Sequence, residues 1–182
     1  MDGTLAKWNN VALDTLYKQY YYKNLEPNIN LLSNVKKLIE RGQDVFILSS
    51  FLNDSKYALE EKNQWLDLYL PEIKKEKRIF VKYGDNKSDY IPNGINHNDY
   101  LIDDYTKNLL EWDIAGGTGI KYLNGINHTN KTWKGLLLND YDLEKGLSAI
   151  FDNKIEDNRL KYELDICDEM YWERIKYEDN CK

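Results

Sequence analysis

Apolar residues recur along the first two thirds of the chain with two alternating periods. Between residues 31 and 41 they fall on one stripe of a helix, and Gly42 is placed to end it. The apolar run at 45–48 is short and continuous, and after a helix ended by glycine such a run favours a buried parallel strand. The alternation continues with helices predicted over 54–70 and 106–112, strands over 78–81 and 100–102, and another strand or a hairpin arm over 120–123.

Repeated alternation of strands and helices implies right-handed crossovers, so the pattern predicts an α/β fold: a Rossmann-like parallel sheet with helices on both faces. Ligands bind such sheets beyond the carboxyl ends of the strands. Polar residues follow two of the predicted strands at that edge: Ser49 and Ser50 after one, Asp103 and Asp104 after the other. The pattern alone therefore places a candidate site there.

Two segments do not share this alternation. Residues 8–30 are rich in Tyr and Asn and predict a small helical cap, inserted into a core that spans residues 1–138. Residues 139–182 are highly charged and predict a helical C-terminal extension packed on the domain by an amphipathic stripe. The aromatic residues of the cap either stack on a nucleobase or pack the cap onto the core; they are Trp8, Tyr17, Tyr20, Tyr21 and Tyr22.

Composition narrows the class of partner. A formal net charge of −6 argues against binding to polymeric nucleic acid, but it leaves room for a small anionic substrate at a local positive site. Two cysteines without a partner motif predict a reducing compartment. No apolar stretch approaches the ~20 residues of a membrane span, and no signal-peptide pattern begins the chain, so we expect no membrane and a cytoplasmic location. A homodimer remains open.

The first residues carry a motif. Asp2-Gly3-Thr4-Leu5 resembles the signature loop of the haloacid dehalogenase superfamily, in which a strand ends in Asp-x-Asp-Gly-Thr-Leu; taken alone, Asp-Gly is a common turn signal. The resemblance makes Asp2 the second aspartate, which protonates the leaving alkoxide and then activates water. The first aspartate, the nucleophile that forms an aspartyl-phosphate, would lie just upstream of Met1. We therefore expect the first core strand to be missing from this sequence.

The phosphate-binding residues implied by the resemblance follow in family order. Ser49 stands where the family keeps a Ser or Thr that bonds a phosphoryl oxygen, and Ser50 could add its hydroxyl or N–H; a helix N-cap is the other interpretation. Lys87 resembles the lysine that neutralises charge shared by phosphate and nucleophile. Lys82 competes for this role, but a lysine followed by Ser-Asp-Tyr-Ile is closer to the deoxyribonucleotidase pattern.

Asp103 and Asp104 form the strongest single signal. Adjacent carboxylates at the end of a buried strand repel each other unless a cation lies between them, although a helix N-cap pair is the alternative. The resemblance implies that Asp103 ligates Mg²⁺ directly, that Asp104 assists, and that the backbone carbonyl of Asp2 adds a ligand. Oxygen ligands suit Mg²⁺.

The resemblance spans roughly residues 1–138 and is closest to the 5'(3')-deoxyribonucleotidases. It implies a Mg²⁺-dependent phosphatase acting on deoxyribonucleoside monophosphates. Two alternatives stay open: a phosphatase for another small phosphate such as a sugar phosphate, and a non-catalytic chain that only binds phosphate-bearing ligands.

Overall fold

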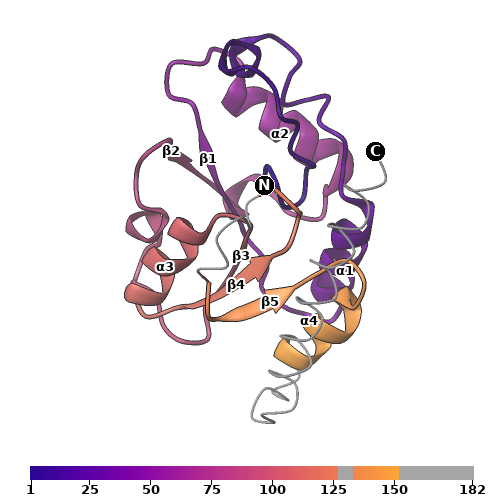
Figure 1. Cartoon of the computed structure of the whole chain (residues 1–182), viewed down its shortest axis with the longest axis vertical. Coiled ribbons are helices and arrows are strands. Elements are labelled where there is room, and N and C mark those ends of the chain that lie inside the picture. Colours follow the sequence, from indigo (N-terminus) through magenta and orange to yellow (C-terminus); the bar gives the residue numbers. More distant parts are fainter. Residues whose placement is uncertain (127–132, 152–182) are drawn as a thin grey trace, which may run out of the picture.

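A computed structural model describes residues 1–126 and 133–151 of the chain. The order of elements is an α/β alternation (Figure 1). The strands are β1 (Ile47–Phe51), β2 (Arg78–Lys82), β3 (Tyr100–Asp103), β4 (Thr118–Tyr122) and β5 (Leu136–Leu138). The α-helices are α1 (Ile29–Glu40), α2 (Ala58–Tyr69), α3 (Thr106–Ile114) and α4 (Leu143–Phe151), and three short 3₁₀ helices are η1 (Leu13–Tyr17), η2 (Lys75–Lys77) and η3 (Lys87–Tyr90).

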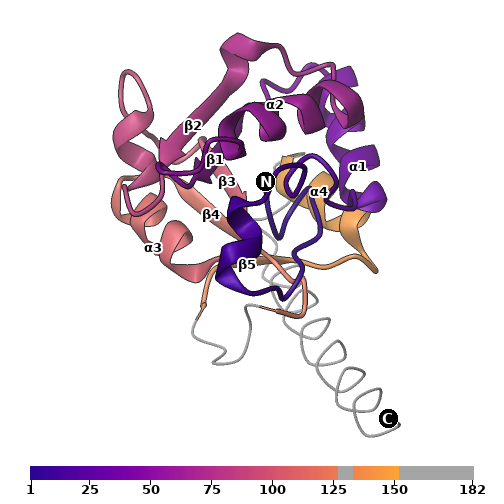
Figure 2. The same ribbon diagram turned by 90° about the horizontal axis from the view of Figure 1, so that it is seen from above.

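All strand pairs are parallel, as the alternation predicts. β1 pairs with β2 in one sheet, and β3, β4 and β5 follow one another in a second sheet. The N-terminus of the chain lies close to both sheets in both views (Figures 1 and 2). The parallel α/β class is confirmed, whereas the described strands form two sheets where one was expected.

Helices cover both faces of the strands. Successive strand residues point to opposite sides, so Ile47 joins the large core cluster while its neighbour Leu48 packs against the small one. The large cluster contains the apolar stripes of α1, α2 and α4, and the small cluster is formed by Leu101 with Leu109 and Trp112 of α3. Figure 2 accordingly shows α3 on one side of the strands and the other α-helices on the far side.

Local sequence explains where α1 begins and ends. The side chain of Asn28 accepts a hydrogen bond from the N–H of Leu31 at 3.3 Å, which satisfies one free donor of the first turn. The helix ends at Glu40, and Gly42 adopts a φ of +81°, which is the conformation that a glycine allows after a helix. The role predicted for Gly42 is confirmed.

The first strand differs from its prediction. β1 begins at Ile47 and continues to Phe51, because Ser49 and Ser50 pair in register with Phe80 and Val81 of β2. The two serines therefore lie inside the strand and not after it. Nor does Ser49 cap the next helix, since Ser55 accepts from the N–H groups where α2 begins, those of Tyr57 and Ala58, at 3.4 and 3.2 Å.

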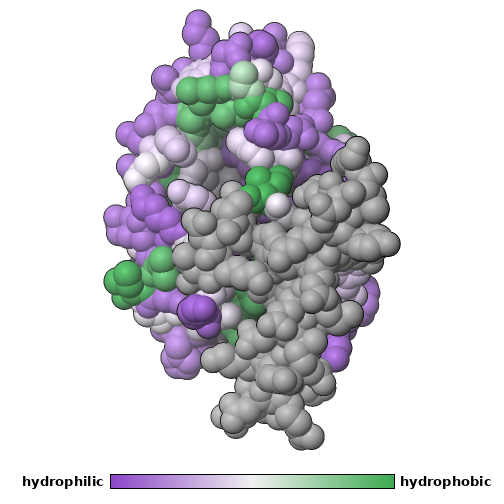
Figure 3. Space-filling view, in the orientation of Figure 1, coloured by the Kyte–Doolittle hydropathy of each residue, from purple (hydrophilic) through white to green (hydrophobic). Residues whose placement is uncertain are grey.

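The cap segment contains η1 and a series of turns, and the last residues of the predicted insert already belong to α1. Val11 and Leu13 are exposed in this segment, and Figure 3 shows one of several apolar patches at the end of the molecule where the cap lies. Tyr22 is buried in the large core cluster, so this aromatic side chain packs the cap onto the core.

Residues after β5 continue into the same core. Leu143, Leu147 and Ile150 of α4 pack in the large cluster beside α1, and Lys37 of α1 bonds Glu144 at 2.9 Å. The rest of the predicted C-terminal helix, with its stripe from Leu160 to Ile175, lies outside the described residues. Among the helices described, none is both long and apolar enough to cross a bilayer.

Candidate active site

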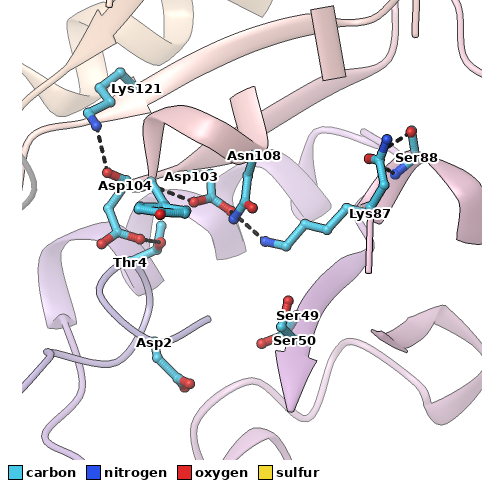
Figure 4. Close-up of polar contacts among 12 residues, drawn as sticks. Asp2, Thr4, Ser49, Ser50, Lys87, Ser88, Asp103, Asp104, Asn108 and Lys121 are labelled. Atoms are coloured by element: carbon cyan, nitrogen blue, oxygen red, sulfur yellow. Dashed lines mark hydrogen bonds and ion pairs between the residues drawn. The ribbon is translucent and has the colours of Figure 1, made fainter. Parts of the chain in front are cut away.

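Lys87 and Asp103, the first aspartate of the predicted pair, meet at one edge of the strands. Lys87 lies on η3 and is buried, and its Nζ donates to Asp103 Oδ2 at 2.5 Å (Figure 4). Asn108 of α3 donates to the same oxygen at 3.0 Å, and the N–H of Tyr105 donates to Asp103 Oδ1 at 2.8 Å. Burial raises the pKa of Asp103, but the charges of Lys87 and the Met1 amine, together with the hydrogen bonds from Lys87 and the Tyr105 N–H, hold that pKa below its usual range.

The second aspartate of the pair faces a different partner. Asp104 Oδ1 accepts from Thr4 Oγ1 at 3.3 Å, and Asp104 Oδ2 accepts from Asn124 Nδ2 at 2.9 Å. Lys121 donates to the backbone carbonyl of Asp104 at 2.7 Å. Gly3 has a φ of +76°, and a Cβ there would overlap the Asp104 carboxylate. Asp104 therefore fixes the Gly3–Thr4 turn against the end of β3.

Asp2 is held by a lysine that sequence reasoning did not single out. Lys62 of α2 is buried, and its Nζ contacts Asp2 Oδ2 at 2.5 Å and the carbonyl of Ser50 at 2.6 Å. Ser49 Oγ lies 3.5 Å from the same ammonium. Lys62 thus joins the N-terminal loop to the end of β1, and it brings Asp2 to the same place as both serines.

The backbone of Met1 lies between the two halves of this site. Met1 is buried, and burial, followed by the charges of Lys87 and Lys62, lowers the pKa of its amine to about 6, while Asp2 and Asp103 act in the opposite direction. The structure joins the predicted site residues in groups: Lys62 links Asp2 with Ser49 and Ser50, Lys87 binds Asp103, and Asp104 contacts the Thr4 turn (Figure 4).

The competing lysine lies elsewhere. Lys82 ends β2 and is exposed, whereas Lys87 is buried against Asp103. Asn108 joins Lys62 as a site residue that the sequence analysis missed. Lys62 did carry a signal, because it falls on the buried stripe of α2 between Ala58 and Trp65, where a lysine needs a partner.

The donors at this edge suit a hard cation. Within residues 1–126 and 133–151, no group of three or more His, Cys, Asp or Glu side chains converges on a point. The candidate metal ligands at this edge are oxygen atoms of Asp103 and Asp2. Mg²⁺ keeps several waters and binds through one or two carboxylates, so this small oxygen set fits Mg²⁺ better than a metal with nitrogen or sulfur ligands.

An Asp-Gly-Thr turn, two serines within a parallel strand, a buried lysine and an aspartate pair, in this chain order, are typical of phosphatases of the haloacid dehalogenase type. A family model for the 5' nucleotidase, deoxy (pyrimidine), cytosolic type C proteins matches residues 4–134. The match covers most of the chain, and the chain belongs to this family; it is a hydrolase of the 5'-nucleotidase kind. No curated protein sequence matches it.

Proposed function

We propose that the protein is a Mg²⁺-dependent phosphomonoesterase that removes phosphate from deoxyribonucleoside monophosphates through a phospho-aspartate. The observation that carries this proposal is a pair of buried lysines in a member of a 5'-nucleotidase family: Lys62 binds Asp2 and the Ser50 carbonyl, and Lys87 binds Asp103. Buried ammonium groups suit a dianionic phosphate, even though the whole chain is acidic.

The nucleophile in this proposal is the aspartate that precedes Met1 in the family motif. A further parallel strand would lead to that aspartate, which stands two residues before Asp2 in the motif. Its carboxylate attacks phosphorus, the bond to the alkoxy oxygen breaks, and water later releases phosphate.

Asp2 is the proton donor to the leaving oxygen. Lys62 binds Asp2 Oδ2, while Asp2 Oδ1 is buried without a hydrogen-bond partner in the described structure and is free to exchange a proton with substrate. An alkoxide is a poor leaving group near neutral pH, so a positioned acid contributes on the order of 10²–10⁴ in rate. Ser49, Ser50 and Lys87 hold the phosphoryl oxygens, and Lys87 offsets the charge that they share with the nucleophile.

The metal in this proposal is held by Asp103 and by the backbone carbonyl of Asp2, with Asp104 in support. Bound there, Mg²⁺ supplies positive charge to the transferring phosphoryl group. Asn108 and the N–H of Tyr105 keep the Asp103 carboxylate in one orientation. Asp104 keeps the Gly3–Thr4 turn, and with it the Asp2 carbonyl, in place.

The test is phosphate release by a version of the protein extended upstream to include the motif's first aspartate. We expect Mg²⁺-dependent release from deoxyuridine and deoxythymidine monophosphates, and much slower release from glucose 6-phosphate. Lys87→Met should abolish most of the activity, whereas Lys82→Met should leave it unchanged because Lys82 is exposed. A preference for the sugar phosphate would favour the other phosphatase hypothesis, and tight binding without turnover would favour a binding module. The cytoplasmic location stays a prediction.

A further inference from the structure

A buried glutamate ties the cap to the helix that holds Asp2. Glu61 precedes Lys62 on α2 and is 4% exposed. It accepts hydrogen bonds from three backbone N–H groups of the cap, those of Tyr20, Tyr22 and Lys23, at 2.5, 3.0 and 3.3 Å. Tyr20 adopts a φ of +69°, which is rare for a residue with a side chain. Glu61 therefore fixes the turn at 20–23, and the next residue in the sequence, Lys62, carries the ammonium that binds Asp2.

The side chains of this turn pack against Lys62, the residue that binds Asp2. The Tyr22 ring packs against Lys62, whose Nζ lies 4.9 Å from the ring centroid. Tyr21 packs edge to face on Tyr22, with centroids 5.0 Å apart and ring planes at 85°. Lys62 in turn binds Asp2. Tyr21 is thus held beside the site by contacts that do not use its hydroxyl.

Two side-chain oxygens of this group are buried without a partner. Tyr21 Oη and Asp2 Oδ1 are the unpaired buried side-chain polar atoms in the described part of the chain. Buried polar atoms in native proteins almost always have partners, and leaving one unpaired is costly. Burial, and then the negative charge of Asp2, raises the pKa of Tyr21, so the hydroxyl keeps its proton and can donate. A substrate oxygen that contacts both groups would accept from Tyr21 and take a proton from Asp2.

We infer that Tyr21 is a substrate-contacting residue whose hydroxyl donates a hydrogen bond to the ester oxygen that leaves with the nucleoside. This inference rests on the proposed function. In the step concerned, the bond between phosphorus and the ester oxygen breaks while that oxygen takes the proton of the Asp2 carboxyl group. Asp2 is left as a carboxylate, and Tyr21 retains its own proton and stabilises the charge that develops on the oxygen.

The test compares two esters in the extended protein with Mg²⁺. The leaving oxygen of deoxyuridine monophosphate is an alkoxide that needs stabilisation, whereas that of p-nitrophenyl phosphate is a stable phenolate that needs little. Tyr21→Phe removes the hydroxyl and keeps the ring. We expect kcat/KM to fall at least about tenfold with the nucleotide and less than about twofold with p-nitrophenyl phosphate.

The control is Tyr69→Phe. Tyr69 is also partly buried and also packs against an aromatic ring, that of Trp65, at 4.8 Å between centroids. We expect it to leave both rates unchanged. Both esters are assayed with the same sample of each variant, so a loss of folded protein lowers both rates equally and leaves their ratio unchanged.

An equal loss with both esters in Tyr21→Phe, or no loss with either, would overturn the role of Tyr21 while the proposed function stands. A parent protein that releases phosphate from neither ester would contradict the proposed function and remove the basis of this inference with it.

Discussion

Replacing Lys62 by methionine should destabilise the protein far more than removing a similar ion pair at the surface. The Lys62 side chain is 1% exposed and that of Asp2 is 17% exposed, with Nζ and Oδ2 2.5 Å apart. Lys77 and Asp44 offer a matched control, because their ion pair has the same 2.5 Å separation but side chains that are 42% and 70% exposed. The two pairs differ mainly in their access to water.

The magnitude follows from what each substitution leaves behind. Lys62→Met keeps the apolar stem but leaves the Asp2 carboxylate and the Ser50 carbonyl without their donor. Removing one partner of a buried pair costs about 3–5 kcal/mol, and since Asp2 regains some water we expect about 2–4 kcal/mol for Lys62→Met. An exposed pair contributes about 0–1 kcal/mol, so Lys77→Met should cost no more than that.

The assay is urea unfolding of the extended protein followed by tryptophan fluorescence, to which the fully buried Trp65 on α2 contributes. The unfolding free energies of Lys62→Met, Asp2→Asn and the double variant together give the coupling energy between the two side chains. We expect this coupling energy to be above about 1.5 kcal/mol. Equal free-energy losses in Lys62→Met and Lys77→Met, or a coupling energy near zero, would refute the view that Lys62 holds Asp2.

Two further predictions concern Mg²⁺ and the first turn. Asp103→Asn should weaken Mg²⁺ activation of the extended protein at least about tenfold more than Asp104→Asn, measured as the Mg²⁺ concentration for half-maximal phosphate release; equal shifts would contradict the assignment of Asp103 as the direct ligand. Gly3→Ala should cost about 3 kcal/mol of unfolding free energy, because its φ is +76° and the new Cβ would overlap Asp104, whereas Gly84→Ala at φ +99° in open space should cost about 1 kcal/mol. Similar costs in urea unfolding would show that Asp104 does not pack against this turn.

The sequence predicted those parts of the fold that depend on local pattern. The helical stripe of α1 and its end at Gly42 could be read directly, because a helix with one buried face and a glycine after it leave a clear signal. β5 was missed, because three apolar residues, Leu136–Leu138, have no readable period. The extent of β1 was also missed, since two serines end an apolar run although the pairing with β2 continues through them.

The site residues divide in a similar way. Lys87 and Asp103 stand in a motif and could be nominated from their neighbours along the chain. Lys62 and Tyr21 depend on contacts between distant segments, 60 residues apart in the case of Lys62 and Asp2, and no local pattern reports such a contact. What the sequence did contain was a pair of charged residues, Glu61 and Lys62, on the buried stripe of α2. Charged residues at core positions indicate buried partners and are the signal to examine.

The central claim is that the aspartate just upstream of Met1 is the nucleophile. It is tested most directly by phosphate release from deoxythymidine and deoxyuridine monophosphates with Mg²⁺. Three proteins are compared: the 182-residue chain, the extended protein, and the extended protein with that upstream aspartate replaced by asparagine. We predict turnover by the extended protein alone, because removing a covalent nucleophile leaves little catalysis above the background of binding and electrostatics. Comparable turnover by all three would show that the reaction does not pass through that carboxylate.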